Sequence, residues 1–542
     1  MSDPINETQQ ESLSKEDSKE AIKRLSQEQL PKGLILPYLI FIRIINAFTI
    51  NTFFQADEYW QSLEPAHEFV YGYGYLTWEW RTGLRSFIHP LIFSGLYQIS
   101  ELLGLGDFGV LIMPKLGQAI IAGIGEYFLY TFIYSVTKNE KIARWGLLIS
   151  ITSAFNWYII TRTFSNSLEL TLTSIALAYW NWDNEINWGK IQVSLIFSAI
   201  SCVIRPTNGI IWIYLSIWFA FSKKLSQTVK LFLHAFVIGS IIFGINTLID
   251  YWYYGSLTIP IWNFINFNVT TSLSKFYGIA PWHFHIFQSL PIILMTALPI
   301  FIYGLKVYPK SQLKWLLVLI IGVFSFIDHK EFRFIYPFQP IIFLITAYGG
   351  FHLNLHHPIL VKYSIYLIII INTLISLFFT QWHERGVIDV IEYLKNDPDV
   401  ESIGFLTPCH STPWQSYLHR PDLVNSTWFL TCEPPLHLLN SDNSSKEVES
   451  YMDESDIFYE DPNKFLFQNF PPVFNKKLRS PGKEYKYEWP THLVVFQDLE
   501  PIITSYIKDS PYQECARFFN TYSHWDDRRR GDVIVYCKWP WE

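Results

Sequence analysis

Long apolar runs recur through the first 380 residues, and they constrain the fold more than any other feature of the sequence. A helix needs about 20 mostly apolar residues to cross a bilayer, where no water satisfies an exposed backbone. Only 16% of the residues are charged, against roughly 25% in a typical soluble protein. The chain is therefore predicted to be a polytopic α-helical membrane protein. The candidate spans are residues 34–54, 87–103, 110–134, 143–160, 165–180, 189–204, 207–222, 229–250, 286–305, 313–327, 337–352 and 360–380.

Basic residues in the short connections orient these spans, because cytosolic loops collect lysine and arginine. Three connections have this character, and they contain Lys138, Lys141 and Arg144; Lys223, Lys224 and Lys230; and Lys306, Lys310 and Lys314. The loop 55–86 and everything after residue 380 then lie on the lumenal side. Twelve crossings would return the tail to the cytosol, so one element between residues 87 and 134 is predicted to be interfacial or re-entrant. About 11 transmembrane helices remain.

Composition divides the chain into three regions. Residues 1–33 are polar and lack an apolar run, which predicts a disordered cytosolic arm. Residues 34–380 form the membrane domain, which includes the lumenal loop 55–86. Residues 381–542 contain 26 acidic and 16 basic side chains, which is typical of a soluble domain and gives no indication of a nucleic-acid partner. Its residue patterns predict a small α/β fold, with a helix over 386–395 and strands at 402–406, 492–496 and 533–536.

Cysteines and glycosylation sequons gather in the tail, and both favour a lumenal, oxidising location. The tail cysteines are Cys409, Cys432, Cys515 and Cys537. Three pairings are possible, of which we expect Cys409–Cys432 and Cys515–Cys537. Candidate sequons begin at Asn6, Asn268, Asn425 and Asn443, of which the last two lie in the tail.

The loop 55–86 holds the first cluster of residues that could carry chemistry. Asp57 and Glu58 follow the first span directly, beside Tyr59 and Trp60. A carboxylate near the bilayer surface can act as a general base, and the nearby Arg81 and Arg85 could bind a phosphate, for which the planar guanidinium is suited. The alternative is an amphipathic loop with interfacial aromatic anchors.

A second cluster lies between two later spans, from Asp328 to Phe334. His329, Lys330 and Arg333 form a potential anion site, or alternatively a membrane boundary with internal ion pairs. A third, diffuse set comprises Arg162 and Arg205 at span ends and the Pro281–His283 segment of a later loop. No zinc-ligand spacing, phosphate-binding glycine loop or dinucleotide fingerprint occurs, so no metal or cofactor is predicted.

Three of these motifs together resemble one family. They are His-Lys-Glu-x-Arg-Phe at His329–Phe334, Pro-Trp-His at Pro281–His283, and the first-loop acids with Glu64, Pro65 and His67. Residues 34–385 resemble the dolichyl-phosphate-mannose-dependent mannosyltransferases, family 22 of the multi-spanning GT-C class. The stretches Asp57–Gln61 and Leu76–Trp80 are most similar to the branch that adds the third, α1,2-linked mannose of the GPI anchor.

The resemblance implies an enzyme of the endoplasmic reticulum membrane that needs no cofactor beyond its lipid donor, dolichyl phosphate mannose. The acceptor would be the GPI precursor glycolipid, and the reaction an inverting single displacement. Asp57 would be the base, with Glu58 as the alternative. His329, Lys330 and Arg333 would bind the departing phosphate, or Arg81 and Arg85 would do so instead. The residues expected to contact substrate are Glu64, His67, Trp78, Glu79, Arg162, Arg205, Trp282 and His283.

Two other functions remain open from the sequence. A sister enzyme of the same family would act on the lipid-linked N-glycan or add the fourth GPI mannose. A transporter of lipid-linked sugars is the alternative from another class, although transporters commonly consist of paired repeats and this sequence has no evident internal symmetry.

Overall fold

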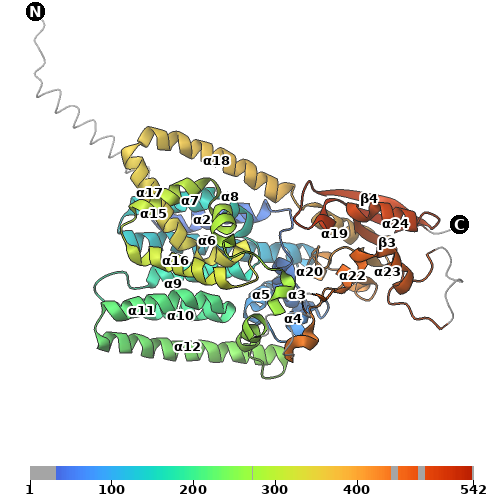
Figure 1. Ribbon diagram of the computed structural model, residues 1–542, viewed down its shortest axis with the longest axis horizontal. Coiled ribbons are helices and arrows are strands. Elements are labelled where there is room, and N and C mark those ends of the chain that lie inside the picture. Colours follow the sequence, from blue (N-terminus) through green and yellow to red (C-terminus); the bar gives the residue numbers. More distant parts are fainter. Residues whose placement is uncertain (1–31, 271–272, 441–447, 449, 474–481, 540–542) are drawn as a thin grey trace, which may run out of the picture.

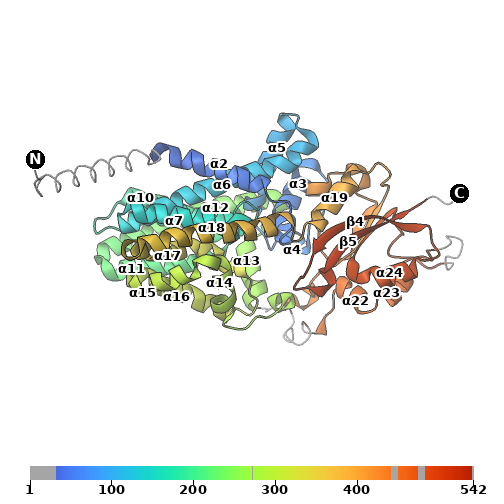
Figure 2. The same cartoon turned by 90° about the horizontal axis from the view of Figure 1, so that it is seen from above.

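The computed structural model describes residues 32–270, 273–440, 448, 450–473 and 482–539. Residues 1–31 of the predicted arm and the Asn443 sequon lie outside these described ranges. The chain forms an elongated helical bundle with a sheet-containing domain at one end (Figure 1). The first residues of helix α2 (Ile35–Phe48) and the last strands of the sheet domain lie at opposite ends of the molecule (Figure 2).

The predicted apolar runs all form helices in the structure. The bundle helices are α2 (Ile35–Phe48), α6 (Gly106–Thr137), α7 (Glu140–Thr152), α8 (Ala154–Ile159), α9 (Ser165–Tyr179), α10 (Trp188–Ile204), α11 (Gly209–Ser222), α12 (Leu225–Tyr254), α14 (Leu290–Leu294), α15 (Leu298–Val307), α16 (Ser311–Phe326), α17 (Gln339–His356) and α18 (Pro358–Gln381). Helix α17 lies in the centre of the bundle, where residues 341–345 have no exposed surface.

Five helical stretches of the described chain are long and apolar enough to cross a membrane: Gly106–Thr137, Leu225–Tyr254, His285–Val307, Phe332–His356 and Pro358–Asn396. Other predicted spans are shorter or interrupted in the structure. The run 143–160 breaks into α7 and α8 at Ser153, whose extended backbone lets its side chain accept a hydrogen bond from the Asn156 amide. A short polar cap of this kind ends one helix and starts the next.

Helix α5 (Ile88–Leu102) differs from the other apolar helices in its surroundings. Its buried Phe93 and Tyr97 belong to a core cluster shared with the loop 55–86 and with the sheet domain. Just before α5, the Phe87 ring stacks on Tyr253 at the end of α12, with 3.9 Å between ring centroids. Helix α5 therefore packs at the end of the bundle that faces the sheet domain.

The loop between α2 and α5 is itself folded into short helices. They are the π-helical turn η2 (Tyr59–Leu63), α3 (Glu64–Tyr71) and α4 (Trp78–Arg81). Two further short elements shape the same end of the molecule, namely α13 (Pro260–Ile265) and the 3-10 helix η8 (Phe332–Phe338).

The domain after α18 is a five-stranded mixed sheet with helices around it. Its strands are β1 (Ile403–Leu406), β2 (Thr427–Phe429), β3 (His492–Phe496), β4 (Tyr512–Thr521) and β5 (Gly531–Lys538), in the order β2-β1-β3-β5-β4. Strand β1 is parallel to β2 and β3, whereas β5 is antiparallel to β3 and β4. The accompanying helices are α19 (Gly386–Asn396), α20 (Gln415–Leu418), α22 (Glu454–Glu460), α23 (Pro462–Asn469) and α24 (Glu500–Tyr506).

The predicted helix and three predicted strands of this domain are present as α19, β1, β3 and β5. Strands β2 and β4 were not predicted from the sequence. Strand β2 has only three residues, and β4 lies at a sheet edge where charged residues such as Glu514 and Arg517 are exposed. An edge strand needs no continuous apolar pattern, because one side of it faces water.

Candidate active site

Asp57 and Arg333 meet at the junction of the bundle and the sheet domain, although 276 residues separate them in the chain. Asp57 lies just before η2, and Arg333 lies in η8. The Arg333 Nη2 atom is 2.6 Å from Asp57 Oδ2, and Arg333 Nε donates to Glu331 Oε2 over 2.7 Å. The Arg333 side chain is 5% exposed and that of Asp57 is 22% exposed. The two sequence clusters thus form one ion-pair network, in which Asp57 keeps access to solvent.

Electrostatics keep Glu331 and Arg333 charged. Burial alone would raise the pKa of Glu331, but the Arg333 and His329 side chains outweigh it and hold the pKa well below its usual value. Burial would lower the pKa of Arg333, yet the charges of Asp57 and Glu331 raise it instead. The Arg333 Nη1 atom is also buried, and no hydrogen-bond partner for it exists among the described residues. One donor of this guanidinium is therefore available for a ligand.

The neighbouring carboxylate Glu58 has a different environment. Its Oε2 atom is 2.8 Å from Arg162 Nη1, and the Arg162 side chain is 1% exposed. The remaining Arg162 donors bind Thr52 and the Tyr158 carbonyl oxygen. Burial raises the pKa of Glu58 in opposition to Arg162. Glu58 and Arg162 thus pair with each other in the protein interior, and among the described residues every nitrogen of the Arg162 guanidinium has a protein acceptor. A direct contact of Arg162 with a substrate stays a prediction from the sequence.

Two further arginines lie close to the Asp57–Arg333 pair. Arg85 Nη2 is 2.7 Å from Glu79 Oε1. Arg205, at the end of α10, binds the neutral side chains of Ser165 and Asn166 over 3.1 and 3.2 Å. In the described part of the chain Arg205 has no salt bridge. A buried cation without a bonded counter-ion is costly, and this cost makes Arg205 a strong candidate for binding an anion.

The pKa of Arg205 reflects the same crowding of cations. Burial, followed by the charges of Arg85 and Arg333, lowers it to about 10, while Glu169 and Asp57 act in the opposite direction. His89, at the start of α5, is also buried beside Arg205 and Arg85, and its pKa is lowered to about 3 by burial and by these cations. Its Nε2 atom has no partner among the described residues. His89 was not predicted as a site residue, because it opens an apolar run and no local charge pattern marks it.

His329 and Lys330 lie next to this network but use their polar atoms on a neighbouring loop. The Lys330 Nζ atom donates to the Ala280 carbonyl oxygen over 2.7 Å, and His329 lies 3.2 Å from both Glu331 and the Gly278 carbonyl oxygen. They thereby hold the loop that carries Pro281–His283. In that loop the Trp282 side chain is 67% exposed, and His283 Nδ1 is buried without a partner among the described residues.

Several predicted ligand residues face the sheet domain instead. Glu64 is fully buried and accepts a hydrogen bond from the Ser416 amide over 2.7 Å. His67 Nε2 lies 2.8 Å from His419 Nδ1, and Arg81 forms an ion pair with Glu433. Trp78 packs on Phe267, with 5.1 Å between ring centroids. The structure thus gives Glu64, His67 and Arg81 interdomain contacts. Their expected roles in binding substrate or phosphate stay predictions from the sequence.

The sheet domain also reaches the segment that carries Asp57. Trp60 donates from Nε1 to the Thr412 carbonyl oxygen over 3.0 Å, and its ring lies 4.2 Å from that of His410. Burial and Arg529 lower the pKa of His410 to about 3, while the charge of Asp57 acts in the opposite direction. His410 was not predicted either, because only the fold brings residues 57 and 410 together.

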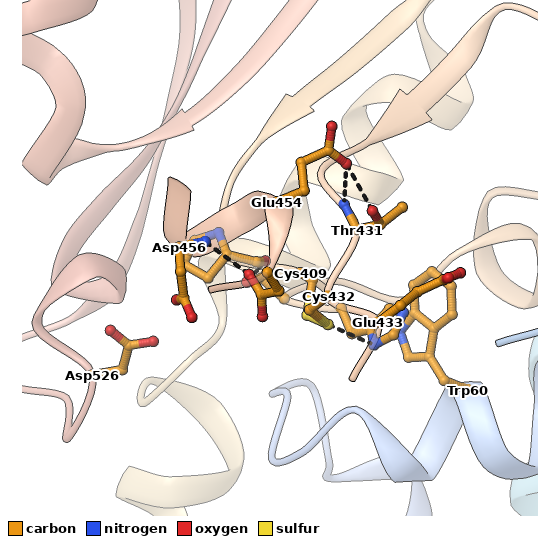
Figure 3. Close-up of a disulfide and its surroundings, with 12 residues drawn as sticks. Trp60, Cys409, Thr431, Cys432, Glu433, Glu454, Asp456 and Asp526 are labelled. Atoms are coloured by element: carbon orange, nitrogen blue, oxygen red, sulfur yellow. Dashed lines mark hydrogen bonds between the residues drawn. A yellow bond between two sulfur atoms is a disulfide. The ribbon is translucent and has the colours of Figure 1, made fainter. Parts of the chain in front are cut away.

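The tail cysteines are paired as Cys409–Cys432 and Cys515–Cys537, which is the pairing expected from the sequence. The first disulfide lies beside Glu433 and Trp60 (Figure 3). His410 lies close to Cys409 and Cys432, but both sulfurs are already bonded to each other, so this group cannot act as a thiolate metal site. Of the candidate sequons, Asn425 is exposed, whereas Asn268 is half-buried and donates to the Phe264 carbonyl oxygen.

The fold has a counterpart among solved structures. The crystal structure of ArnT from Cupriavidus metallidurans bound to undecaprenyl phosphate matches 93% of this chain and 97% of its own, with a TM-score of 0.58 at 10% sequence identity. A helical membrane bundle with a sheet domain over one end, and a charged site at their junction, defines a multi-spanning protein of the GT-C fold class.

The sequence comparisons identify the family within that class. The chain belongs to the Alg9-like mannosyltransferase family, whose model matches residues 34–419. It is 51% identical to GPI mannosyltransferase 3 of Debaryomyces hansenii, over 96% of this chain and 95% of that protein. It is 36% identical to mouse GPI alpha-1,2-mannosyltransferase 3, over 92% of this chain and 87% of that protein.

Proposed function

We propose that this protein transfers mannose from dolichyl phosphate mannose to the GPI-anchor precursor, forming the α1,2 linkage of its third mannose. Membership of the mannosyltransferase family and the high identity to GPI mannosyltransferase 3 enzymes from yeasts and mouse support this assignment. The single structural observation that carries it is the pairing of Asp57 with Arg333, beside Arg85 and Arg205, at one end of the bundle. It combines an acceptor for a proton with cations for a phosphate.

The reaction would be a single displacement with inversion. The acceptor hydroxyl oxygen attacks C1 of the donor mannose, and the bond from C1 to the phosphate oxygen breaks with its electron pair leaving on dolichyl phosphate. The hydroxyl proton passes to the Asp57 carboxylate, which acts as general base. Asp57 is favoured over Glu58 because Glu58 is buried against Arg162, whereas Asp57 keeps 22% of its side-chain surface exposed.

The departing phosphate would be stabilised by fixed cations. Arg205 lacks a salt bridge in the described chain, and Arg333 has an unpartnered Nη1 atom. Preorganised donors of this kind stabilise developing charge without reorganising. Arg85 would contribute through the same cluster, and no metal is needed in this scheme. His329 and Lys330 would act indirectly, because they hold the loop that carries Pro281–His283.

We further propose 11 membrane crossings, with the site and the sheet domain in the lumen of the endoplasmic reticulum. The crossings would be α2, α6, α7 with α8, α9, α10, α11, α12, α14 with α15, α16, α17 and α18. Helix α5 would be the interfacial element, because it packs against the loop 55–86 and the sheet domain. An odd number of crossings takes a cytosolic amino terminus to a lumenal carboxyl end, where disulfides are stable.

Purified enzyme in nanodiscs, supplied with dolichyl phosphate mannose and a GPI precursor bearing two mannoses, tests the proposal. We expect a product with a third mannose that an α1,2-specific mannosidase removes. Product formed only on a lipid-linked N-glycan, or only on a precursor with three mannoses, would identify a sister enzyme instead. Binding of both lipids without any new glycosidic bond would favour the transporter.

A further inference from the structure

The connection between strands β4 and β5 exposes two large aromatic side chains. Tyr522 is 72% exposed and Trp525 is 85% exposed. Large aromatic rings gain much of their stabilisation from burial. Two exposed rings on one short connection therefore indicate a surface that another molecule covers. The remainder of this turn is well anchored, because Asp526 accepts hydrogen bonds from Arg528. We call residues 522–525 the aromatic tip.

Hydrogen bonds fix the aromatic tip beside the end of α18. Thr521 Oγ1 lies 3.0 Å from His383 Nδ1, and the Glu384 amide donates to the Asn520 carbonyl oxygen over 2.8 Å. His524 Nε2 lies 2.7 Å from Glu384 Oε1. His383 and Glu384 follow directly after α18, an apolar 24-residue helix that ends at Gln381. In Figure 1, α18 ends beside the sheet domain at β4.

The C-terminal end of α2 lies beside the C-terminal end of α18. The amides of Asn51 and Phe53, just after α2, donate to the carbonyl oxygens of Thr380 and Glu384. At this level Trp382 is 54% exposed and Phe48, the last residue of α2, is 42% exposed. The aromatic tip therefore continues a zone of exposed aromatic residues at the ends of two apolar helices.

We propose that the aromatic tip, together with Trp382, inserts into the headgroup region of the same bilayer that the bundle crosses. Tryptophan and tyrosine are enriched in this layer because their rings are apolar and their N–H and O–H groups remain hydrated. The occupant of this surface is thus the phospholipid interface. The inference rests on the membrane-spanning topology proposed above and is independent of mannose transfer.

The membrane contact would position the sheet domain over the active site. Arg529, a few residues beyond the tip, donates from Nη2 to the Cys409 carbonyl oxygen over 3.3 Å. Cys409 precedes His410, whose ring packs on Trp60. Two contacts thus connect the aromatic tip to the segment that carries Asp57: the hydrogen bond from Arg529 to Cys409 and the packing of His410 on Trp60.

Photolabelling of the full-length protein tests this inference. Nanodiscs would contain a phospholipid with a diazirine near the glycerol end of an acyl chain, and labelled peptides would be identified by mass spectrometry. We expect labelling of α18 and of the aromatic tip. Trp539, which is 55% exposed, is the internal control, because the eight residues of β5 separate it from the tip by roughly 25 Å, and it should remain unlabelled.

The outcomes separate the two proposals. Labelling of α18 without labelling of the aromatic tip would overturn the interfacial contact and leave the topology intact, whereas an unlabelled α18 would overturn the topology itself. As a second measurement, we expect the double substitution Tyr522→Asp and Trp525→Asp to speed amide hydrogen exchange in residues 409–414 at least threefold in nanodiscs. The matched control Trp539→Asp should leave that exchange unchanged, and equal rates in all three proteins would contradict the positioning role.

Discussion

The loop 55–86 has two regions with similar composition and different environments. Around Asp57, the loop contacts Arg333 from a distant helix, and the nearby Arg205 has no salt bridge among the described residues. Around Glu64 and His67, the loop contacts the sheet domain, and both side chains are fully buried there. Acidic and basic residues therefore define a site only where the fold leaves some of their hydrogen-bonding and ion-pairing groups without a protein partner.

The largest expected difference between the two regions is catalytic. Asp57→Asn removes the proposed base and should lower mannose transfer by about 10²–10⁴-fold, while a melting curve in nanodiscs should change little, since Arg333 keeps its bonds to Glu331. A radioactive transfer assay measures the effect. Near-normal activity in this variant would show that the base is another residue.

A sharper test uses the neighbouring carboxylate. Glu58→Gln leaves the buried Arg162 cation without its counter-ion, which should destabilise the protein by about 3–5 kcal/mol. Thermal unfolding in nanodiscs measures this loss. The enzyme that remains folded should retain its turnover number. A stable but inactive Glu58→Gln protein would show that Glu58, and not Asp57, is the catalytic base.

Arg205→Gln tests whether the arginine without a salt bridge binds the donor. A charge-assisted hydrogen bond contributes about 1.5–3 kcal/mol, so the KM for dolichyl phosphate mannose should rise about 10–100-fold. Arg81→Ala is the matched control, because Arg81 lies in the interdomain contact with Glu433. An equal rise in KM for both variants would argue against a specific role of Arg205 in donor binding.

The interdomain region should respond to acid. Burial, together with the neighbouring His419, lowers the pKa of His67 from 6.5 to about 3. The unfolded chain therefore binds a proton that the folded chain excludes, and the stabilisation from His67 is lost progressively as the pH falls from 6.5 towards 3. We expect a melting temperature that falls less steeply over this range in His67→Asn than in the wild type. Parallel pH profiles would contradict this assignment.

The smallest effect concerns the rim of the same interface. Arg81 and Glu433 are 51% and 41% exposed, so their ion pair should contribute at most about 1 kcal/mol. Arg81→Ala should therefore lower the melting temperature by no more than a few degrees and leave transfer activity intact. A loss of donor use in this variant would restore the phosphate-binding role first expected for Arg81.

The sequence alone determined the features that depend on local patterns. Apolar runs identified every bundle helix, because a spanning segment must satisfy its own backbone. The His329–Phe334 motif and the acids after the first span indicated the family before any geometry was known. Helix α19 and strands β1, β3 and β5 followed from their apolar patterns, whereas the edge strand β4 carries no such pattern.

Only the tertiary structure decided which of these residues can act together. It separated Asp57 from Glu58, although they are neighbours in the chain, because Arg162 and Arg333 approach them from different elements. It moved Arg81 to an interdomain contact and brought His89 and His410 to the site. The physical reason is that the availability of a charged group depends on its partners, and these partners lie tens to hundreds of residues away.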